Sequence, residues 1–259
     1  MAVASVLDDI QLAIQMADKA REIALRYFRM DLGLSMKADR TPVTLADREI
    51  ERVLRDMLAE LRGGDGVLGE EWPDSGPDKP RQWVIDPIDG TGAFATGSPL
   101  FGALIGLLDK AVPVLGVIDA CALQERWVAW RGEATLNGVP CQTSSQRSLK
   151  DASIGSTAIH QYAPADYAAF ERISSRAAIT RLGGDSYAYG LVASGHLDAV
   201  IETGLKPYDY LPILPIIEAA GGVITDWTGQ PLGFSSKGHV VAAATRELHA
   251  ELIELIGRH

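Results

Sequence analysis

Two aspartates close an apolar run in the first half of the chain and supply its clearest chemical signal. Asp86 and Asp89 follow Trp83–Ile85, whose aromatic and β-branched residues predict a buried strand. Pro87 has no N–H to give to a neighbouring strand, so we expect this strand to end at Asp86. The two carboxylates would then lie at the carboxyl end of a strand, where open α/β sheets hold their ligands.

The next residues add ligands of two further kinds. Ile88 could offer its backbone carbonyl to the hard divalent cation that carboxylate oxygens favour. Gly90 and Thr91 form a turn whose backbone N–H groups could hold an anion. A metal ion and an anion at one turn indicate phosphate chemistry.

Two distant acids, Glu70 and Asp209, occur in the same kind of local sequence, at the end of an apolar segment or the start of a helix. If they converge with Asp86 and Asp89, the four carboxylates repel one another and their pKa values rise. Two divalent cations about 4 Å apart would remove this repulsion and clamp a phosphoryl group. Simpler interpretations stay open: Asp209 as a helix N-cap and Glu70 as a solvated loop residue.

The composition limits the classes of protein to which the chain could belong. Its 259 residues are 47% hydrophobic, which favours a substantial core over disorder. The formal net charge of −10 argues against binding of a nucleic-acid backbone. No apolar run approaches the about 18–20 residues of a membrane helix, and no basic leader precedes the first acids. Cys121 and Cys141 lack metal-ligand spacing, so we expect reduced thiols in a cytoplasmic protein.

Hydrophobic periodicity predicts a mixed α/β chain. Helices are expected at residues 6–29, 46–61, 166–178, 186–193, 209–220 and 247–256, and strands at 67–68, 83–86, 101–108, 112–118, 126–130, 198–201, 223–226 and 240–244. Thr44 could cap the second helix, and Asn137-Gly138 predicts a two-residue hairpin turn. We expect a single domain over residues 1–259. If it has two lobes, the polar segment near 140–150 separates a metal-binding lobe, 1–145, from a substrate-facing lobe, 146–259.

Four separated motifs resemble the inositol monophosphatase family. They are Thr41-Pro42-Val43-Thr44 with Asp47, Gly69-Glu70-Glu71, Asp86-Pro87-Ile88-Asp89-Gly90-Thr91, and Tyr208-Asp209 followed by Glu218-Ala219-Ala220-Gly221-Gly222. Their order and separation also fit, and the resemblance covers residues 5–258. It implies an α/β (α+β) fold, an alternating αβαβα sandwich of the inositol monophosphatase and fructose-1,6-bisphosphatase type, and usually a homodimer.

The resemblance also implies hydrolysis of a small phosphate monoester by direct attack of water, with two or three Mg²⁺ ions per site. Glu70, Asp86 and the Ile88 carbonyl would hold the first metal. Asp86, Asp89 and Asp209 would hold the second, and Glu70 would share in a weaker third site. The partners it implies are small molecules, with neither nucleic acid nor membrane.

Catalytic roles follow from the same resemblance. Thr91, assisted by Asp47, would orient and deprotonate the attacking water, and Glu70 would act in catalysis through its metal. The N–H groups of Gly90 and Thr91 would hold the phosphate. Lys37 is a loop residue similar to one in the family, and it is either a cation of the site or a plain surface lysine.

The leaving group is suggested by segments that look like the histidinol-phosphatase branch: Ser98–Ile105, Val114–Asp119 with Gln124–Trp127, and Gly204–Tyr210. Asp185 lies in the segment that faces substrate in the family, where inositol enzymes have a small apolar residue. Histidinol phosphate carries an amine and an imidazole, which Asp185 and Glu202 would suit, with Asp89 also in contact with substrate.

Alternatives stay open at this point. Asp185 could merely cap a helix starting near Ser186. The substrate could be an inositol or sugar monophosphate, and the chain could be a metal-binding scaffold without turnover. His160, His196 and His239 show no ligand spacing and are expected to be surface or structural residues.

Overall fold

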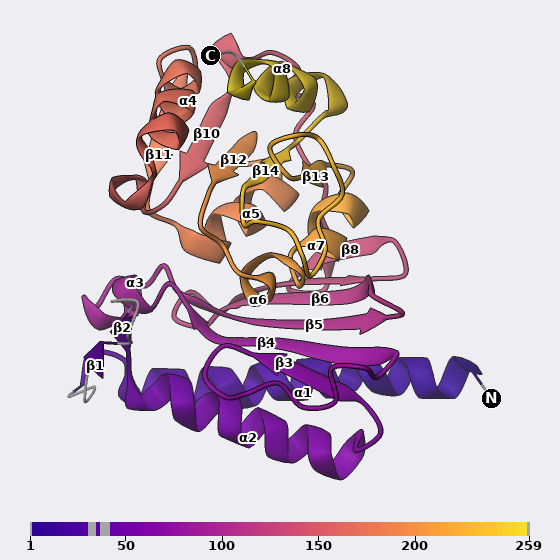
Figure 1. Ribbon diagram of the computed structural model, residues 1–259. Helices are drawn as coiled ribbons and strands as arrows, with labels where there is room; N and C mark the ends of the chain where they lie inside the picture. Colours follow the sequence, from indigo (N-terminus) through magenta and orange to yellow (C-terminus); the bar gives the residue numbers. More distant parts are fainter. Residues whose placement is uncertain (1, 31–34, 37–41, 258–259) are drawn as a thin grey trace.

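Two β-sheets alternate with three helical layers (Figure 1). The computed structural model describes residues 2–30, 35–36 and 42–257; Lys37 and Thr41 lie outside them. Helices α1 (Ala2–Tyr27) and α2 (Leu45–Leu61) form the outer layer below the first sheet. The αβαβα order of layers confirms the expected fold class.

The first sheet has seven strands in the order β3-β4-β5-β6-β7-β8-β9. Their bounds are Gly66–Gly69, Arg81–Asp89, Gly102–Asp109, Val112–Ala120, Glu125–Trp130, Glu133–Leu136 and Val139–Pro140. Strand β3 runs parallel to β4, and all later neighbours are antiparallel. The expected hairpin is confirmed, because Leu136 pairs with Val139 and both turn residues have positive φ.

Strand β4 continues past the point at which it was expected to end. It extends to Asp89, and its pairing with β5 shifts register between Asp86 and Asp89. The expectation of an end at Asp86 was wrong because Pro87 lies in this irregularity, where a residue without an N–H is tolerated.

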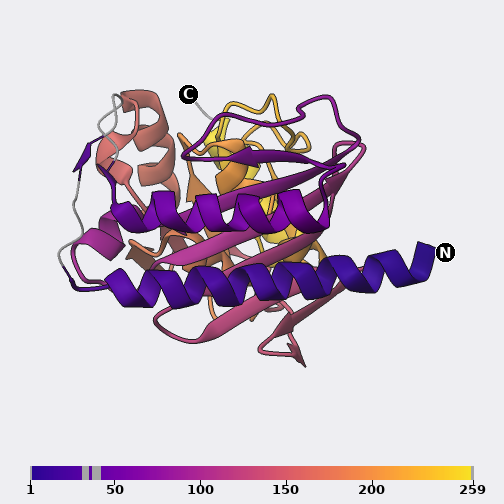
Figure 2. The same cartoon turned by 90° about the horizontal axis from the view of Figure 1, so that it is seen from below.

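Helices α1 and α2 lie side by side across the lower face of the first sheet (Figure 2). Thr44 caps α2 as expected, since its Oγ1 accepts from Ala46 N at 3.1 Å and Asp47 completes a capping box. A two-stranded pair, β1 (Ser35–Met36) and β2 (Pro42–Val43), precedes α2. A short helix, α3 (Thr91–Ala95), follows β4 directly.

The second sheet has five strands in the order β11-β10-β12-β14-β13. In chain order from β10, they are Ser153–Ser156, Ile179–Leu182, Ala199–Glu202, Val223–Thr225 and Val240–Ala243. Helices α4 (Pro164–Ser174) and α8 (Arg246–Ile256) cover its outer face. Helix α5 (Asp185–Ala193) packs between the two sheets. Short 3₁₀ turns occur at Leu149–Asp151 (η1) and Ile159–Gln161 (η2).

The helix expected over 209–220 is instead two short helices, α6 (Pro207–Tyr210) and α7 (Leu214–Ala219). Pro215 cannot donate an N–H to a continuous helix, which accounts for the break. The corner packs closely on the first sheet: an added Cβ at Gly116 would meet the Pro212 carbonyl, and one at Gly106 would lie 3.1 Å from Pro212 Cα. This contact fixes the end of α6 above β4.

Three buried clusters fill the spaces between these layers: one between the first sheet and α1 and α2, one between the two sheets around α5 and α7, and one between the second sheet and α4 and α8. Cys121 is buried and Cys141 half-buried, and both thiols are free. Among the described residues, no helix combines the length and apolar character that crossing a membrane requires.

Candidate active site

Three carboxylates converge above the end of β4. Asp86, Asp89 and Asp209 each offer an oxygen, and these oxygens lie within 4.8 Å of one another. Residues three apart on a regular strand point to opposite faces, so the bulge between Asp86 and Asp89 is what brings both side chains to one place. The α6–α7 corner adds Asp209 from more than a hundred residues away.

Without a cation, mutual repulsion and burial disfavour the ionised form of these carboxylates. Burial, followed by the charges of Glu70, Asp89 and Asp209, raises the pKa of Asp86 well above its usual range. Asp86 is 2% exposed, and its Oδ1 has no hydrogen-bond partner within the described residues. Converging hard oxygens around an unsatisfied buried oxygen fit a divalent cation.

Glu70 and Ile88 lie beside the cluster. Glu70 follows directly after β3, and both residues line a cavity of about 650 Å³ together with Asp86, Asp89 and Asp209. All five positions that the sequence suggested as metal ligands therefore border one space.

Asp209 does not cap its helix in the expected way. It is the third residue of α6, and its Oδ2 accepts from Lys206 N at 2.7 Å. The N-cap interpretation was wrong because α6 begins earlier, at Pro207. The Asp209 carboxylate thus accepts a hydrogen bond at the start of α6 and also offers an oxygen to the cluster with Asp86 and Asp89.

A second chain of contacts links Thr91 to Asp47. Thr91 Oγ1 lies 3.0 Å from the Ile88 carbonyl and 3.4 Å from Asp47 Oδ1. The other oxygen of Asp47 accepts from Thr44 N at 2.8 Å and from Thr44 Oγ1 at 2.5 Å. Burial raises the pKa of Asp47 to about 6, against the opposing effect of the Thr44 hydrogen bonds. A buried carboxylate in this state could receive a proton near neutral pH.

Gly90 joins β4 to α3 in a conformation that favours glycine. Its φ is +80°, and an added Cβ would lie 3.0 Å from the Asp185 carboxylate and 3.1 Å from the Leu100 carbonyl. Gly90 and Thr91 line the same cavity as the carboxylate cluster. The turn thus allows close approach of a ligand and of Asp185.

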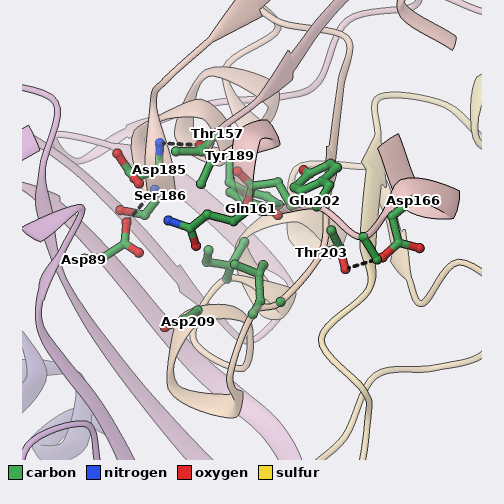
Figure 3. A pocket seen from close by; sticks show the side chains of 16 residues that line it. Asp89, Thr157, Gln161, Asp166, Asp185, Ser186, Tyr189, Glu202, Thr203 and Asp209 are labelled. Atoms are coloured by element: carbon green, nitrogen blue, oxygen red, sulfur yellow. Dashed lines mark hydrogen bonds between the residues drawn. The ribbon is translucent and has the colours of Figure 1, made fainter. Parts of the chain in front are cut away.

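Asp185 is the first residue of α5, with φ +46°, and no side chain makes a cap hydrogen bond at this helix start. The helix-cap alternative was therefore wrong. Its backbone N–H donates to Thr157 Oγ1 at 3.1 Å. Burial, followed by the charges of Asp89 and Glu202, raises the pKa of Asp185 to about 8. Figure 3 shows this side chain close to Asp89, on the same side of the cavity.

A second cavity of about 360 Å³ adjoins the first and reaches toward the second sheet. Glu202, at the end of β12, is 4% exposed and accepts from Tyr189 Oη at 2.9 Å. Burial is the main cause that raises the pKa of Glu202 to about 7. Figure 3 shows Asp89, Asp185, Glu202 and Asp209 around this cavity.

Sequence reasoning missed several residues at the site. Ser186 N donates to Asp89 Oδ2 at 2.6 Å and orients that carboxylate. Thr157, Tyr162 and Asp166 line the second cavity. Asp166 was visible only as an acid at a helix start, and Tyr162 carried no motif at all.

Comparison with known proteins places the chain in a family. The model of the inositol monophosphatase family matches residues 7–259. The chain is 39% identical to a chloroplastic bifunctional phosphatase IMPL2 of Arabidopsis thaliana, over 94% of this chain and 73% of that protein. It is 35% identical to a histidinol-phosphatase of Chlorobaculum parvum, over 96% of each.

A solved structure agrees closely with this fold. The inositol monophosphatase of Zymomonas mobilis is 41% identical, with a TM-score of 0.89 over 97% of this chain and 98% of that one. The sequence and structure comparisons therefore indicate the same family as the motifs that contain the carboxylate cluster. The chain belongs to the inositol monophosphatase family and is a phosphoric monoester hydrolase.

Proposed function

We propose that this enzyme hydrolyses histidinol phosphate, a phosphate monoester with a cationic leaving group. The observation that carries the proposal is the charge of the second cavity. Five carboxylates line it, and its sixteen described lining residues include no lysine, arginine or histidine. Asp89 and Asp209 are also proposed below as metal ligands, which leaves Asp166, Asp185 and Glu202 for the leaving group. A protonated amine would compensate these charges, whereas a neutral polyol would not.

Metal binding is proposed at the carboxylate cluster. Glu70, Asp86, Asp89, Asp209 and the Ile88 carbonyl would hold Mg²⁺, since they supply the oxygen ligands that this ion prefers. When bound, Mg²⁺ would neutralise the phosphate charge and favour ionisation of the attacking water. The described lining of both cavities offers only one basic side chain, His160, so the protein itself supplies little positive charge for phosphate.

Thr91 and Asp47 would handle the proton of the attacking water. The Thr91 hydroxyl can accept a hydrogen bond from water while donating to Asp47 Oδ1 or to the Ile88 carbonyl. Asp47 could take up the proton through Thr91. The backbone N–H groups of Gly90 and Thr91 would hold the phosphate oxygens, and no covalent intermediate is required.

Two relatives of different specificity support two candidate substrates. The similarity to the Chlorobaculum parvum histidinol-phosphatase supports the proposal. The 41% identity to the Zymomonas mobilis inositol monophosphatase supports inositol 1-phosphate as the second candidate. The acidic lining of the cavity favours the first. The homodimer and the cytoplasmic location stay predictions.

Steady-state kinetics with both esters would test the proposal. We expect kcat/KM for histidinol phosphate to exceed that for inositol 1-phosphate at least tenfold in Mg²⁺, and phosphate release to stop in EDTA. A preference for inositol 1-phosphate would favour the second candidate. Absence of release from any ester, with or without Mg²⁺, would instead indicate a scaffold without turnover.

A further inference from the structure

Tyr162 and Asp166 line the second cavity, and neither has a role in the reaction described above. Tyr162 directly follows the turn η2, and Asp166 is the third residue of α4. Figure 3 shows Asp89 and Asp185 on one side of the cavity and Asp166 on the opposite side. A leaving group attached to a phosphate at the carboxylate cluster would extend toward these two residues.

The hydroxyl of Tyr162 is already used by the protein. It donates to the Ile201 carbonyl at 3.1 Å and shares a hydrogen bond of 2.7 Å with Ser156 Oγ. The ring also packs edge-on against Phe170, with centroids 6.2 Å apart. Because these contacts hold both the hydroxyl and the ring, Tyr162 offers the cavity a fixed aromatic surface.

Asp166 is held toward the cavity by residues of other elements. Its Oδ2 lies 3.4 Å from Thr203 Oγ1 and 3.2 Å from His239 Nε2. A simple role at the start of α4 would direct this carboxylate to backbone N–H groups of its own helix, but α4 has no side-chain cap hydrogen bond. The side chain is 22% exposed, which leaves part of it accessible to a ligand.

Two carboxylates, Glu202 and Asp166, lie near Tyr162. Burial is the largest cause that raises the pKa of this phenol, and the charges of Glu202 and Asp166 add to the shift. A cation beside the ring would therefore meet both the ring electrons and two nearby carboxylates, which act in the same direction.

We propose that Tyr162 and Asp166 form a subsite that receives a flat cationic ring of the leaving group. This inference rests on the proposed function and deepens it, because it assigns the ring of the substrate to a place in the cavity. The amine would remain with Asp185, on the other side. The two contacts together would distinguish an aromatic amino-alcohol phosphate from an aliphatic amino-alcohol phosphate and from a polyol phosphate.

Two esters and two substitutions at one position test the subsite. Histidinol phosphate carries both an amine and a ring, whereas 2-aminoethyl phosphate carries only the amine. We expect Tyr162→Leu to raise KM for histidinol phosphate about tenfold with kcat within threefold, and to leave KM for 2-aminoethyl phosphate unchanged. Tyr162→Phe keeps the ring and should keep both KM values within threefold.

Asp166→Asn tests the second residue without removing any packing. It should raise KM for histidinol phosphate about fivefold, while Glu171→Gln, an exposed change of the same charge on the same helix, should have no effect. Competitive inhibition by the product histidinol gives a second readout, with Ki expected to rise as KM does. Melting curves of each variant establish that it is folded.

The outcomes separate this inference from the proposed function. If the wild-type enzyme prefers histidinol phosphate but neither Tyr162→Leu nor Asp166→Asn changes KM or Ki, the subsite is disproved and the function stands. If Tyr162→Leu raises KM for both amino-alcohol esters equally, Tyr162 has only a structural role and the subsite is again disproved. If the wild-type enzyme prefers inositol 1-phosphate, both proposals fail.

Discussion

The carboxylate of Asp185 lies directly against the backbone of Gly90, so that a Cβ added at Gly90 would be 3.0 Å from Asp185 Oδ2. One residue belongs to the turn that follows β4, and the other begins α5. This contact joins the proposed phosphate-binding turn to the residue proposed to bind the amine.

Gly90→Ala should therefore damage both the turn and the site. The φ of +80° disfavours alanine by about 1 kcal/mol, and the new methyl group would displace Asp185. We expect kcat/KM to fall at least tenfold and the melting temperature to drop by a few degrees. Gly229→Ala is the control for backbone strain alone, because its φ is +78°, nothing lies within 4 Å of an added Cβ there, and it lines neither cavity of the site. Equal activity of the two variants would contradict this account.

Asp185→Asn should change substrate preference more than overall activity. Loss of a charged hydrogen bond to an amine costs about 1.5–3 kcal/mol, so kcat/KM for histidinol phosphate should fall about 10- to 100-fold. The value for inositol 1-phosphate should change less than threefold. Asp78→Asn, in an exposed loop, controls for the change in net charge. A similar loss for both esters would show that Asp185 does not recognise the amine.

Thr91→Val should lower kcat about 100-fold or more and leave KM nearly unchanged. Valine keeps the shape of threonine but removes the hydroxyl that lies between Asp47 and the Ile88 carbonyl. Thr180→Val is the control, since Thr180 lines neither cavity and its hydroxyl donates to the Ser174 carbonyl at 3.5 Å. Single-turnover measurements would check that chemistry, and not product release, is slowed. A wild-type kcat in Thr91→Val would remove the hydroxyl from the mechanism.

Mg²⁺ should raise the melting temperature of the wild-type protein, because any ligand of the folded state stabilises it. Asp86→Asn should abolish most of this rise. In EDTA the same variant should melt higher than wild type, since it removes one of the mutually repelling buried carboxylates. Differential scanning calorimetry with and without Mg²⁺ measures both effects, with Asp78→Asn as control. An identical Mg²⁺ response in wild type and Asp86→Asn would argue against the proposed metal site.

Ionisation of Glu202 should lower the free energy of unfolding of the metal-free protein as pH rises. Its pKa is about 7 in the folded protein, above the value of 4.5 expected when unfolded. The folded state therefore binds the proton more tightly, and this contribution to the free energy of unfolding is lost as pH rises from about 4.5 to above 7.

Glu202→Gln mimics the protonated form and can still accept from Tyr189 Oη. Relative to wild type, the variant should gain stability between pH 5 and pH 8, on the order of 3 kcal/mol. Urea unfolding in EDTA at the two pH values measures this, with Glu171→Gln as the exposed control. A constant difference across the range would show that the pKa of Glu202 is not raised by folding.

Local sequence determined most elements of this fold and predicted the chemistry proposed for the site. The run before Asp86 specified a buried strand, Thr44 and Asp47 specified a capping box, and Asn137-Gly138 specified a tight hairpin. These features depend on neighbours within a few residues, so a linear pattern is sufficient to predict them. The acids beside glycine and proline likewise indicated metal and phosphate through their residue types and spacing alone.

Tertiary structure decided what required contacts between distant segments or a departure from regular geometry. The bulge in β4 turns Asp86 and Asp89 to one side, and the break before α7 carries Asp209 to meet them; the regular patterns predicted neither. Neither Tyr162 nor Asp166 belonged to a motif that pointed to a site, because the role proposed for them depends on a cavity formed by segments distant in the sequence. Spacing along a chain predicts the period of an element, whereas the walls of a cavity depend on how whole layers pack.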